Sequence, residues 1–239
     1  MPAAPHRTLV AALRAMARPD AVAEVARFFH ADPDARSSDN RILGVPIGQV
    51  FPIAKAHAGL PLDQVEALLD DPHYEVRMAA VSVMDFQARA RRTPPAQRQA
   101  LFELYLRRHD RINNWDLVDR AAPHVVGGWL ADRPRDALYQ LARSPNPWER
   151  RTAIVATWFF IRTGDIDDTF RLAELLLHDA HPLVQKAVGS WVREAGKHDP
   201  SRLLALLEAF ATTMPRPMLR QAVEKLPVAL KTRFLERPP

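Results

Sequence analysis

The chain has no cysteine, and it has only 8 glycines against 21 prolines in 239 residues. Without cysteine, disulfides and thiolate metal sites are excluded, and a reducing cytosol is compatible. No glycine-rich phosphate loop and no Ser/His/Asp set is evident. The nine histidines are scattered, and His178 and His181, three residues apart, have no acidic ligand set beside them. We therefore expect neither a metal site nor a cofactor.

Long apolar runs are also missing. The N-terminal segment MPAAPHRTLVAALRAMARPD is interrupted by Arg14 and Arg18, as in an amphipathic helix, so we expect neither a signal peptide nor a membrane span. With 47% apolar and 26% charged residues, the composition is ordinary for a soluble globular protein. No linker-like stretch divides the chain, so a single domain over residues 1–239 is the prediction.

The charge balance is basic, with a net charge of +5 and an isoelectric point near 9.9. Lys and Arg neutralise phosphates, so a polyanionic partner fits this balance. Charge alone is a weak signal, because many basic proteins bind no nucleic acid.

The chain repeats one corner, in which a polar or proline-containing turn precedes a helix that opens on a large apolar residue. The lead residues are Tyr74, Trp115, Trp148, Leu183 and Met218, at steps of 41, 33, 35 and 35. A period near 35–40 with two helices per unit indicates an all-α, α-α superhelix of HEAT type. The first helices of the pairs are expected at 61–69, 95–107, 134–142, 167–177 and 200–211.

The repeats are expected over residues 59–230. Residues 1–58 add two or three less regular helices, and the polar segment DPDARSSDN, at 32–40, is expected to be a mobile loop.

The most informative segment is NNWDLVD, which puts Trp115 and Asp119 four residues apart. On a helix that spacing makes the two side chains neighbours on one face. Leu117, Val118 and Ala121 point to the opposite, core side, with Asp119 about 150° away. A large aromatic on a solvent-facing surface indicates that something covers it, so this pair is the leading candidate site.

In a HEAT solenoid one helix of each pair lines a concave face, and equivalent positions stack along it. Counted from the lead residues, Asp119 shares its position with Met78, Thr152 and Ala187, beside a row formed by Val118, Arg151, Lys186 and Gln221. A concave basic groove with an aromatic and a carboxylate predicts a nucleic-acid site, with Arg77, Arg150, Arg151 and Lys186 as candidate contacts to the nucleic acid. Further basic residues on these helices are Arg193, Lys197, Arg216 and Arg220.

Several motifs then resemble one family. NNWDLVDRAAPHVVG, NPWERRTAIVATWFF, LVQKAVGSWVREAGKHDP and TTMPRPMLRQAVEKLP, with DNRILGVPIGQV nearer the N-terminus, are similar to the DNA alkylation repair family of AlkD-like HEAT-repeat DNA glycosylases. The resemblance covers roughly residues 20–230, and the order and spacing of the motifs make it specific.

The resemblance implies an enzyme that hydrolyses the N-glycosidic bond of N3- and N7-alkylated purines in duplex DNA, without flipping the base into a pocket. Such a base is already a good leaving group, so a carboxylate that stabilises an oxocarbenium-like sugar and positions water is the main requirement. Carried over by motif, Asp119 is the catalytic carboxylate, Trp115 packs on the deoxyribose, and Arg151 contacts the phosphate backbone. The implied protein is a monomer that acts on double-stranded DNA in the cytoplasm, at the nucleoid.

One departure from the family pattern concerns the second aromatic wall of the site. The family has Trp directly after the glycine of the Gln-Lys-Ala-x-Gly run, whereas here Ser190 follows Gly189 and the tryptophan is Trp191. One place on a helix is a 100° turn, so Trp191, the candidate second DNA contact, is expected to face the core or a neighbouring helix.

Two other functions stay open. One is a non-catalytic HEAT-repeat relative that binds damaged or branched DNA, which the shifted tryptophan favours. The other is a HEAT scaffold for protein or RNA. The alternatives are that Asp119 is an ordinary solvated carboxylate, Trp115 a core residue, and Arg151 a structural partner of Glu149 or Asp119. Trp148 and Trp158 are expected in the core.

Overall fold

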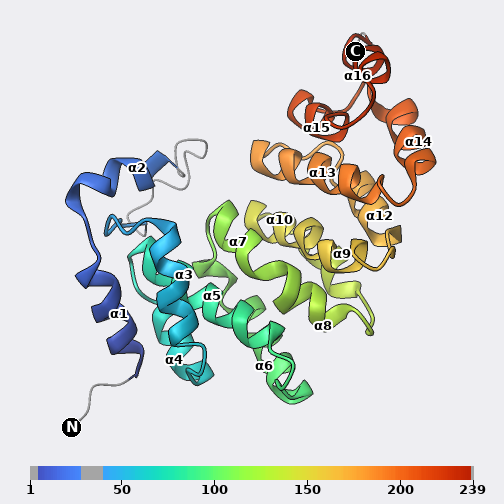
Figure 1. The fold of residues 1–239 in the computed structure, drawn as a ribbon. Coiled ribbons are helices and arrows are strands. Elements are labelled where there is room, and N and C mark those ends of the chain that lie inside the picture. The colour runs from blue at the N-terminus through green and yellow to red at the C-terminus, as the bar shows by residue number, and fades with distance from the viewer. Residues whose placement is uncertain (1–4, 28–39, 238–239) are drawn as a thin grey trace. The chain divides into compact units, whose positions relative to one another are not determined.

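A computed structural model describes residues 5–27 and 40–237, and within these ranges the chain is helical, without a β-strand (Figure 1). The all-α prediction is confirmed. The N-terminal part contains α1 (Pro5–Ala15), a 3₁₀ turn (Pro19–Ala21), α2 (Val22–Ala26) and α3 (Ile47–Ala56). Of the expected 32–40 loop, residues 32–39 lie outside the described residues.

Helix pairs follow, close to the predicted bounds. The first pairs are α4 (Leu62–Leu69) with α5 (Tyr74–Arg89), and α6 (Pro95–Arg107) with α7 (Trp115–Ala122). Next come the 3₁₀ turn η4 (His109–Arg111) between α6 and α7, a π-helical turn (Pro123–Gly127) and α8 (Gly128–Leu130). The later pairs are α9 (Asp136–Leu141) with α10 (Pro147–Ala156), α12 (Asp167–Leu175) with α13 (Pro182–Ala195), and α14 (Pro200–Phe210) with α15 (Arg216–Ala222). The short α11 (Trp158–Ile161) follows α10, and α16 (Val228–Leu235) ends the described chain.

The chain divides into two compact units, Met1–Trp129 and Leu130–Pro239. The boundary falls within α8 and not in a linker, which is why composition did not reveal it. A single domain over 1–239, with one concave groove, stays a prediction.

In the first unit α5 is the central helix. It packs against α3 and α7 on either side and against α4 and α6, and its residues from Tyr74 to Asp85 are all buried. Small residues such as Ala79, Ala80 and Ser82 let neighbouring helices approach it closely. Consequently α5 fixes the relative positions of α3 and α7.

In the second unit α13 has the corresponding central place, between α10 and α15. A β-carbon on Gly189 would lie 2.2 Å from the carbonyl oxygen of Met218. Only glycine therefore permits the close approach of α13 and α15 at this point.

The corners share a hydrogen-bond pattern. The side chains of Asp71, Ser144 and Asp179 accept the backbone N–H two residues later, at 2.8, 3.0 and 2.8 Å. A long side chain six residues later donates back to the carbonyl oxygen of the same residue, at 3.0, 2.9 and 2.7 Å. The donors are Arg77, Arg150 and Gln185.

This pattern corrects the register of the repeats. The helices begin after His73, Asn114, Asn146, His181 and Pro215. Counted from these caps, the fifth helical residues are Met78, Asp119, Arg151, Lys186 and Arg220. The predicted equivalence of Asp119 with Thr152 and Ala187 was therefore wrong by one place, because the large apolar residue is not at the same helical position in each repeat.

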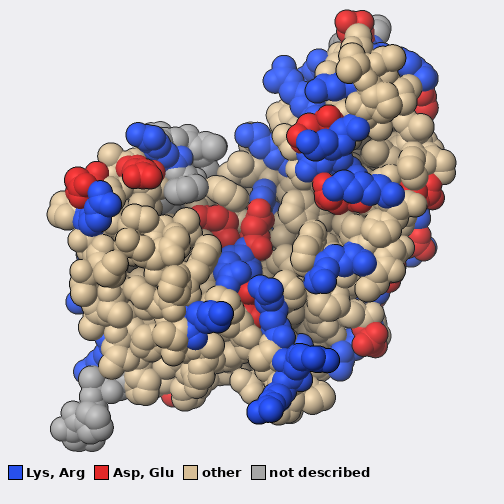
Figure 2. All heavy atoms as spheres, in the orientation of Figure 1, with Lys and Arg blue, Asp and Glu red and all other residues tan. Residues whose placement is uncertain are grey.

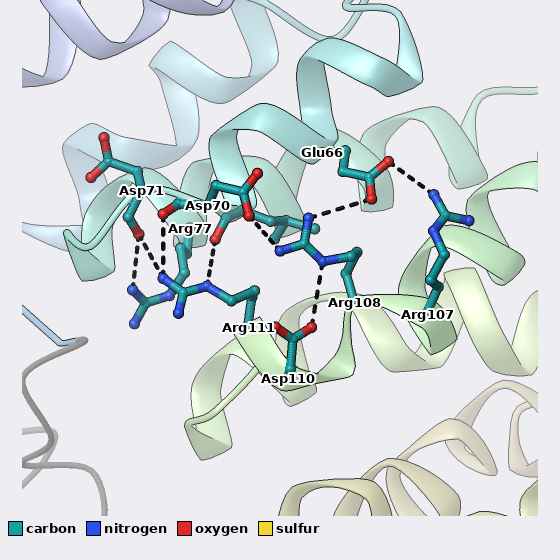
Figure 3. Close-up of polar contacts among 9 residues, drawn as sticks. Glu66, Asp70, Asp71, Arg77, Arg107, Arg108, Asp110 and Arg111 are labelled. Carbon is teal, nitrogen blue, oxygen red and sulfur yellow. Dashed lines mark hydrogen bonds and ion pairs between the residues drawn. The ribbon is translucent and has the colours of Figure 1, made fainter.

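Many arginines are used inside the fold. Between α4 and the end of α6, Arg107 and Arg108 pair with Glu66 at 2.9 and 3.3 Å (Figure 3). Arg111 donates its Nε–H to the carbonyl oxygen of Leu69 at 3.0 Å. Exposed pairs of this kind add little stability. The ion pairs leave the net charge unchanged, because each joins a cation to an anion, but they occupy arginines that the sequence alone would offer to DNA.

Candidate functional site

The start of α7 determines how the candidate site is oriented. Asp116, in the first turn, accepts hydrogen bonds from the backbone N–H of Leu117 at 2.9 Å and from Nδ2 of Asn114 at 2.8 Å. A carboxylate at this place is also favoured by the helix dipole. The phase that results is the predicted one: Leu117 and Val118 are completely buried, and Asp119 is partly exposed.

Trp115 and Asp119 line one cavity of about 340 Å³ in the first unit. This volume is at the lower end of the range for small-molecule sites. Its wall consists of three aromatic side chains, two aliphatic or thioether side chains, two carboxylates and one guanidinium. The lining residues are Ile47 and Phe51 of α3, Tyr74 and Met78 of α5, and Trp115, Asp116, Asp119 and Arg120 of α7.

This lining suits a ligand with flat apolar faces and positive charge. Aromatic faces attract cations through their quadrupoles, and the carboxylates of Asp116 and Asp119 add full negative charges. The wall can thus stabilise a cation, or a centre that becomes cationic during a reaction.

Asp116 was missed by the sequence analysis. Its Oδ2 accepts the hydroxyl proton of Tyr74, across from α5. Burial raises the pKa of Asp116 to about 6, and the charge of Asp119 adds to the rise, whereas the hydrogen bonds from Tyr74 and Leu117 oppose it. Burial and the negative charge of Asp116 raise the pKa of Tyr74 well above 10. Perturbed groups in a cavity are characteristic of functional sites.

Arg120 was also missed. Its guanidinium lies between the rings of Phe51 and Phe86, 4.8 Å from each centroid. Its Nε–H donates to Oγ of Ser82 at 3.0 Å, and Nη1 lies 3.0 Å from Oδ2 of Asp85. These partners are 34 to 69 residues away in the sequence, so no local pattern could have indicated them.

Of the other candidate residues, all but Arg77 belong to the second unit. Arg151 is 6% exposed and donates Nη1–H to the carbonyl oxygen of Leu183. Arg150 pairs with Asp179 through Nε at 2.6 Å and Nη2 at 3.1 Å, in addition to closing its corner. Lys186, in α13, is exposed. Over α13 and α15, Lys and Arg gather with Asp and Glu among them (Figure 2).

Trp191 is turned to a neighbouring helix, as expected from the shift by one place. Its indole N–H donates to the carbonyl oxygen of Val155 in α10, at 3.0 Å. Ser190 instead contacts α15, with its Oγ 3.1 Å from Oε1 of Gln221. The polar edge of the tryptophan is therefore used within the fold.

The assignment of Arg77 as a DNA contact needs correction. Arg77 is completely buried. Its guanidinium bonds to the carbonyl oxygens of Asp71 and Pro72, and to the side chain of Asn113 at 3.2 Å. It closes a corner and has no surface to offer a phosphate. The sequence could not distinguish this role from binding, because both use a single arginine near a helix start.

Comparison with known proteins identifies the family and the fold. The family model described as DNA alkylation repair enzyme matches residues 9–226. The chain belongs to this DNA alkylation repair family. A solved structure described as a predicted DNA alkylation repair enzyme from Enterococcus faecalis matches with a TM-score of 0.66 and 16% identity, covering 88% of this chain and 97% of that one. At that identity the match shows the shared fold.

No curated protein matches the chain. Within residues 5–27 and 40–237, no helix is long and apolar enough to cross a membrane. The same residues contain no cluster of three His, Asp or Glu suited to a metal ion. Family membership indicates DNA as the partner and repair of alkylation damage as the process.

Proposed function

We propose that this family member is a DNA glycosylase that excises cationic N3- and N7-alkylated purines from duplex DNA. The observation that carries the proposal is the placement of Asp119 and Trp115 on one wall of an aromatic, acidic cavity. An acid–base catalyst for the leaving group is not required, because the alkylated purine is already positively charged.

In the proposed reaction the bond between C1′ and the purine nitrogen breaks, and its electron pair neutralises the departing base. Positive charge then develops on C1′ and the ring oxygen of the sugar. The Asp119 carboxylate stabilises this charge and orients the water whose oxygen forms the new bond to C1′, while the water releases one proton to the solvent. Trp115 packs on the deoxyribose and adds the attraction of its ring face.

DNA is proposed to remain stacked, with phosphate contacts that hold the backbone. Lys186, which is exposed, is the main proposed contact. Arg151 is proposed as a second contact because, unlike Arg77, it keeps 6% of its surface exposed, and Arg150 is a neighbour that fixes the corner. The protein is proposed to act as a monomer in the cytoplasm, at the nucleoid.

The test is release of 7-methylguanine and 3-methyladenine from methylated duplex DNA. Asp119→Asn keeps the shape but removes the charge, so excision should fall on the order of 10²-fold or more while duplex binding stays nearly intact. Asp63→Asn, an exposed aspartate in the first turn of α4, is the matched control. If wild type released these bases no faster than spontaneous depurination, the glycosylase proposal would be rejected.

A second function, binding of damaged or branched DNA without catalysis, is favoured by one observation. The family resemblance would place a tryptophan directly after Gly189, but here it is one residue later, at Trp191. The indole N–H of Trp191 donates to the carbonyl oxygen of Val155. This function predicts tight binding to such DNA that Asp119→Asn leaves unchanged, with no base release by either protein.

A further inference from the structure

Arg120 has no role in the reaction as described so far. It follows Asp119 directly and lines the same cavity. Its side chain is 18% exposed. Three helices contribute to its surroundings: α7 carries it, Phe51 comes from α3, and Ser82, Asp85 and Phe86 come from α5.

The contacts of Arg120 fix the plane of its guanidinium but do not use all of its hydrogen-bond donors. A guanidinium carries five N–H donors. Among the described residues, Nε contacts Ser82 and Nη1 contacts Asp85, so the Nη2 amino group is left for a ligand. Burial lowers the pKa of Arg120, and an arginine stays charged at neutral pH even so.

Asp85 does not cancel this charge alone. Its carboxylate is shared with Arg89 at 3.4 Å and with Nδ1 of His124 at 2.9 Å. One buried carboxylate thus serves several basic groups, and Arg120 retains positive charge toward the cavity.

The negative charge of the cavity is unfavourable for the phosphates of a bound nucleotide, and Arg120 can offset it. Asp116 and Asp119 attract a cationic base or sugar, but they repel the phosphates on either side of that nucleotide. Arg120 is the cationic side chain in the cavity wall. A planar guanidinium fits two phosphate oxygens, and its clamped position means that little side-chain entropy is lost on binding.

We propose that Arg120 binds a phosphate of the lesion strand next to the nucleotide whose base is removed. This role rests on the proposed glycosylase function. It makes Arg120 a substrate-binding residue that anchors the backbone while Asp119 faces the sugar. The alternative is a purely structural residue that joins α3, α5 and α7.

The test combines variants of the arginine with neutral methylphosphonate linkages placed singly on either side of a tetrahydrofuran abasic analogue. Binding to these duplexes requires no excision. In wild type, the methylphosphonate at the contacted position should weaken binding about tenfold or more, because a hydrogen-bonded charge pair is lost. Arg120→Gln should bind the all-phosphate duplex about tenfold more weakly, and the same methylphosphonate should then have no further effect.

Arg89→Gln is the matched control. Arg89 pairs with the same Asp85, but its side chain is 51% exposed and it does not line the cavity. It should keep the wild-type response to every methylphosphonate. The salt slope of binding should fall by about one unit for Arg120→Gln. Arg120→Met, which keeps a long side chain but carries no charge, replaces the glutamine variant if that protein does not fold, and the same loss of response is expected.

The proposal is overturned if no single flanking methylphosphonate weakens wild-type binding, or if the arginine variant keeps the wild-type response to it. It is also overturned if Arg120→Gln lowers excision with binding unchanged, since Arg120 would then act through Asp119. Coupling between Arg120 and one phosphate, in a protein that releases no base, would leave this assignment intact and reject only the glycosylase.

Discussion

Replacing Asp116 by asparagine should stabilise the protein at alkaline pH and not at acidic pH. The pKa of Asp116 is raised from 3.8 to about 6, so the folded state binds this proton more tightly than the unfolded state. The stability that the protonated carboxyl contributes is complete below pH 3.8 and is lost as pH rises through about 6. Above that pH the ionised group destabilises the fold.

The size of the effect follows from the shift. About two pKa units correspond to roughly 3 kcal/mol, which is an upper limit because Asp116 is only partly buried and solvent at the cavity screens it. Asparagine never carries the charge, but it offers one acceptor oxygen where the carboxylate accepts from Tyr74, Asn114 and Leu117. Losing one of these bonds offsets about 1 kcal/mol. The net gain should be about 1–2 kcal/mol at pH 8.

Thermal unfolding at pH 8 and pH 4.5 measures this difference. In a chain of this length, 1 kcal/mol shifts Tm by about 2–4 °C. We expect Asp116→Asn to raise Tm by a few degrees at pH 8 and to leave it level or lower at pH 4.5. The control is Asp63→Asn, which should change Tm by the same amount at both pH values. A variant destabilised equally at both pH values would refute the reasoning, since Asp116 would then be a net stabilising carboxylate.

The other expectations concern the reaction, the DNA and the packing. Tyr74→Phe removes a hydrogen bond that lowers the pKa of Asp116. If ionised Asp116 supports catalysis, the excision rate of the wild type should rise as pH increases through about 6. In Tyr74→Phe the same rise should occur at a higher pH. If the midpoint of this pH dependence were the same in Tyr74→Phe, or if Asp116→Asn still showed the rise in rate, Asp116 would be excluded as the titrating group. Arg151→Ala should weaken binding to all duplexes alike, with the salt slope reduced by about one unit, and loss of affinity for one sequence only would contradict a phosphate contact. Gly189→Ala should destabilise the protein by about 1–3 kcal/mol in denaturant titration, because the new methyl group would lie 2.2 Å from the Met218 oxygen. The control is Gly59→Ala, at an exposed glycine with nothing near its β-position. Equal effects of the two substitutions on stability would show that α13 and α15 adjust freely.

The helices could be predicted well because their signals are local. Proline marks the start of α6 and α14, and the predicted range 95–107 is the observed one. The apolar period around Leu117 gave the phase of α7 because burial repeats every turn. These features need only the residues within one helix and its flanking turns.

The errors arose where the fold uses residues for purposes that composition does not reveal. Arg77 was expected to face a ligand, but its hydrogen bonds are to loop carbonyls, which the sequence does not display. Asp116 and Arg120 were overlooked because their partners are on α3 and α5. The cavity is a tertiary feature, and only a conformation of the whole first unit defines it.

The corner hydrogen bonds have a consequence for the order of folding. They join residues two and six apart, as between Asp179, His181 and Gln185, and such short loops close at little entropic cost. The cavity instead draws on residues from Ile47 to Arg120, so it is complete only after three helices have docked. In hydrogen exchange, corner amides should therefore gain protection before those lining the cavity, and binding competence should be among the last properties acquired on refolding.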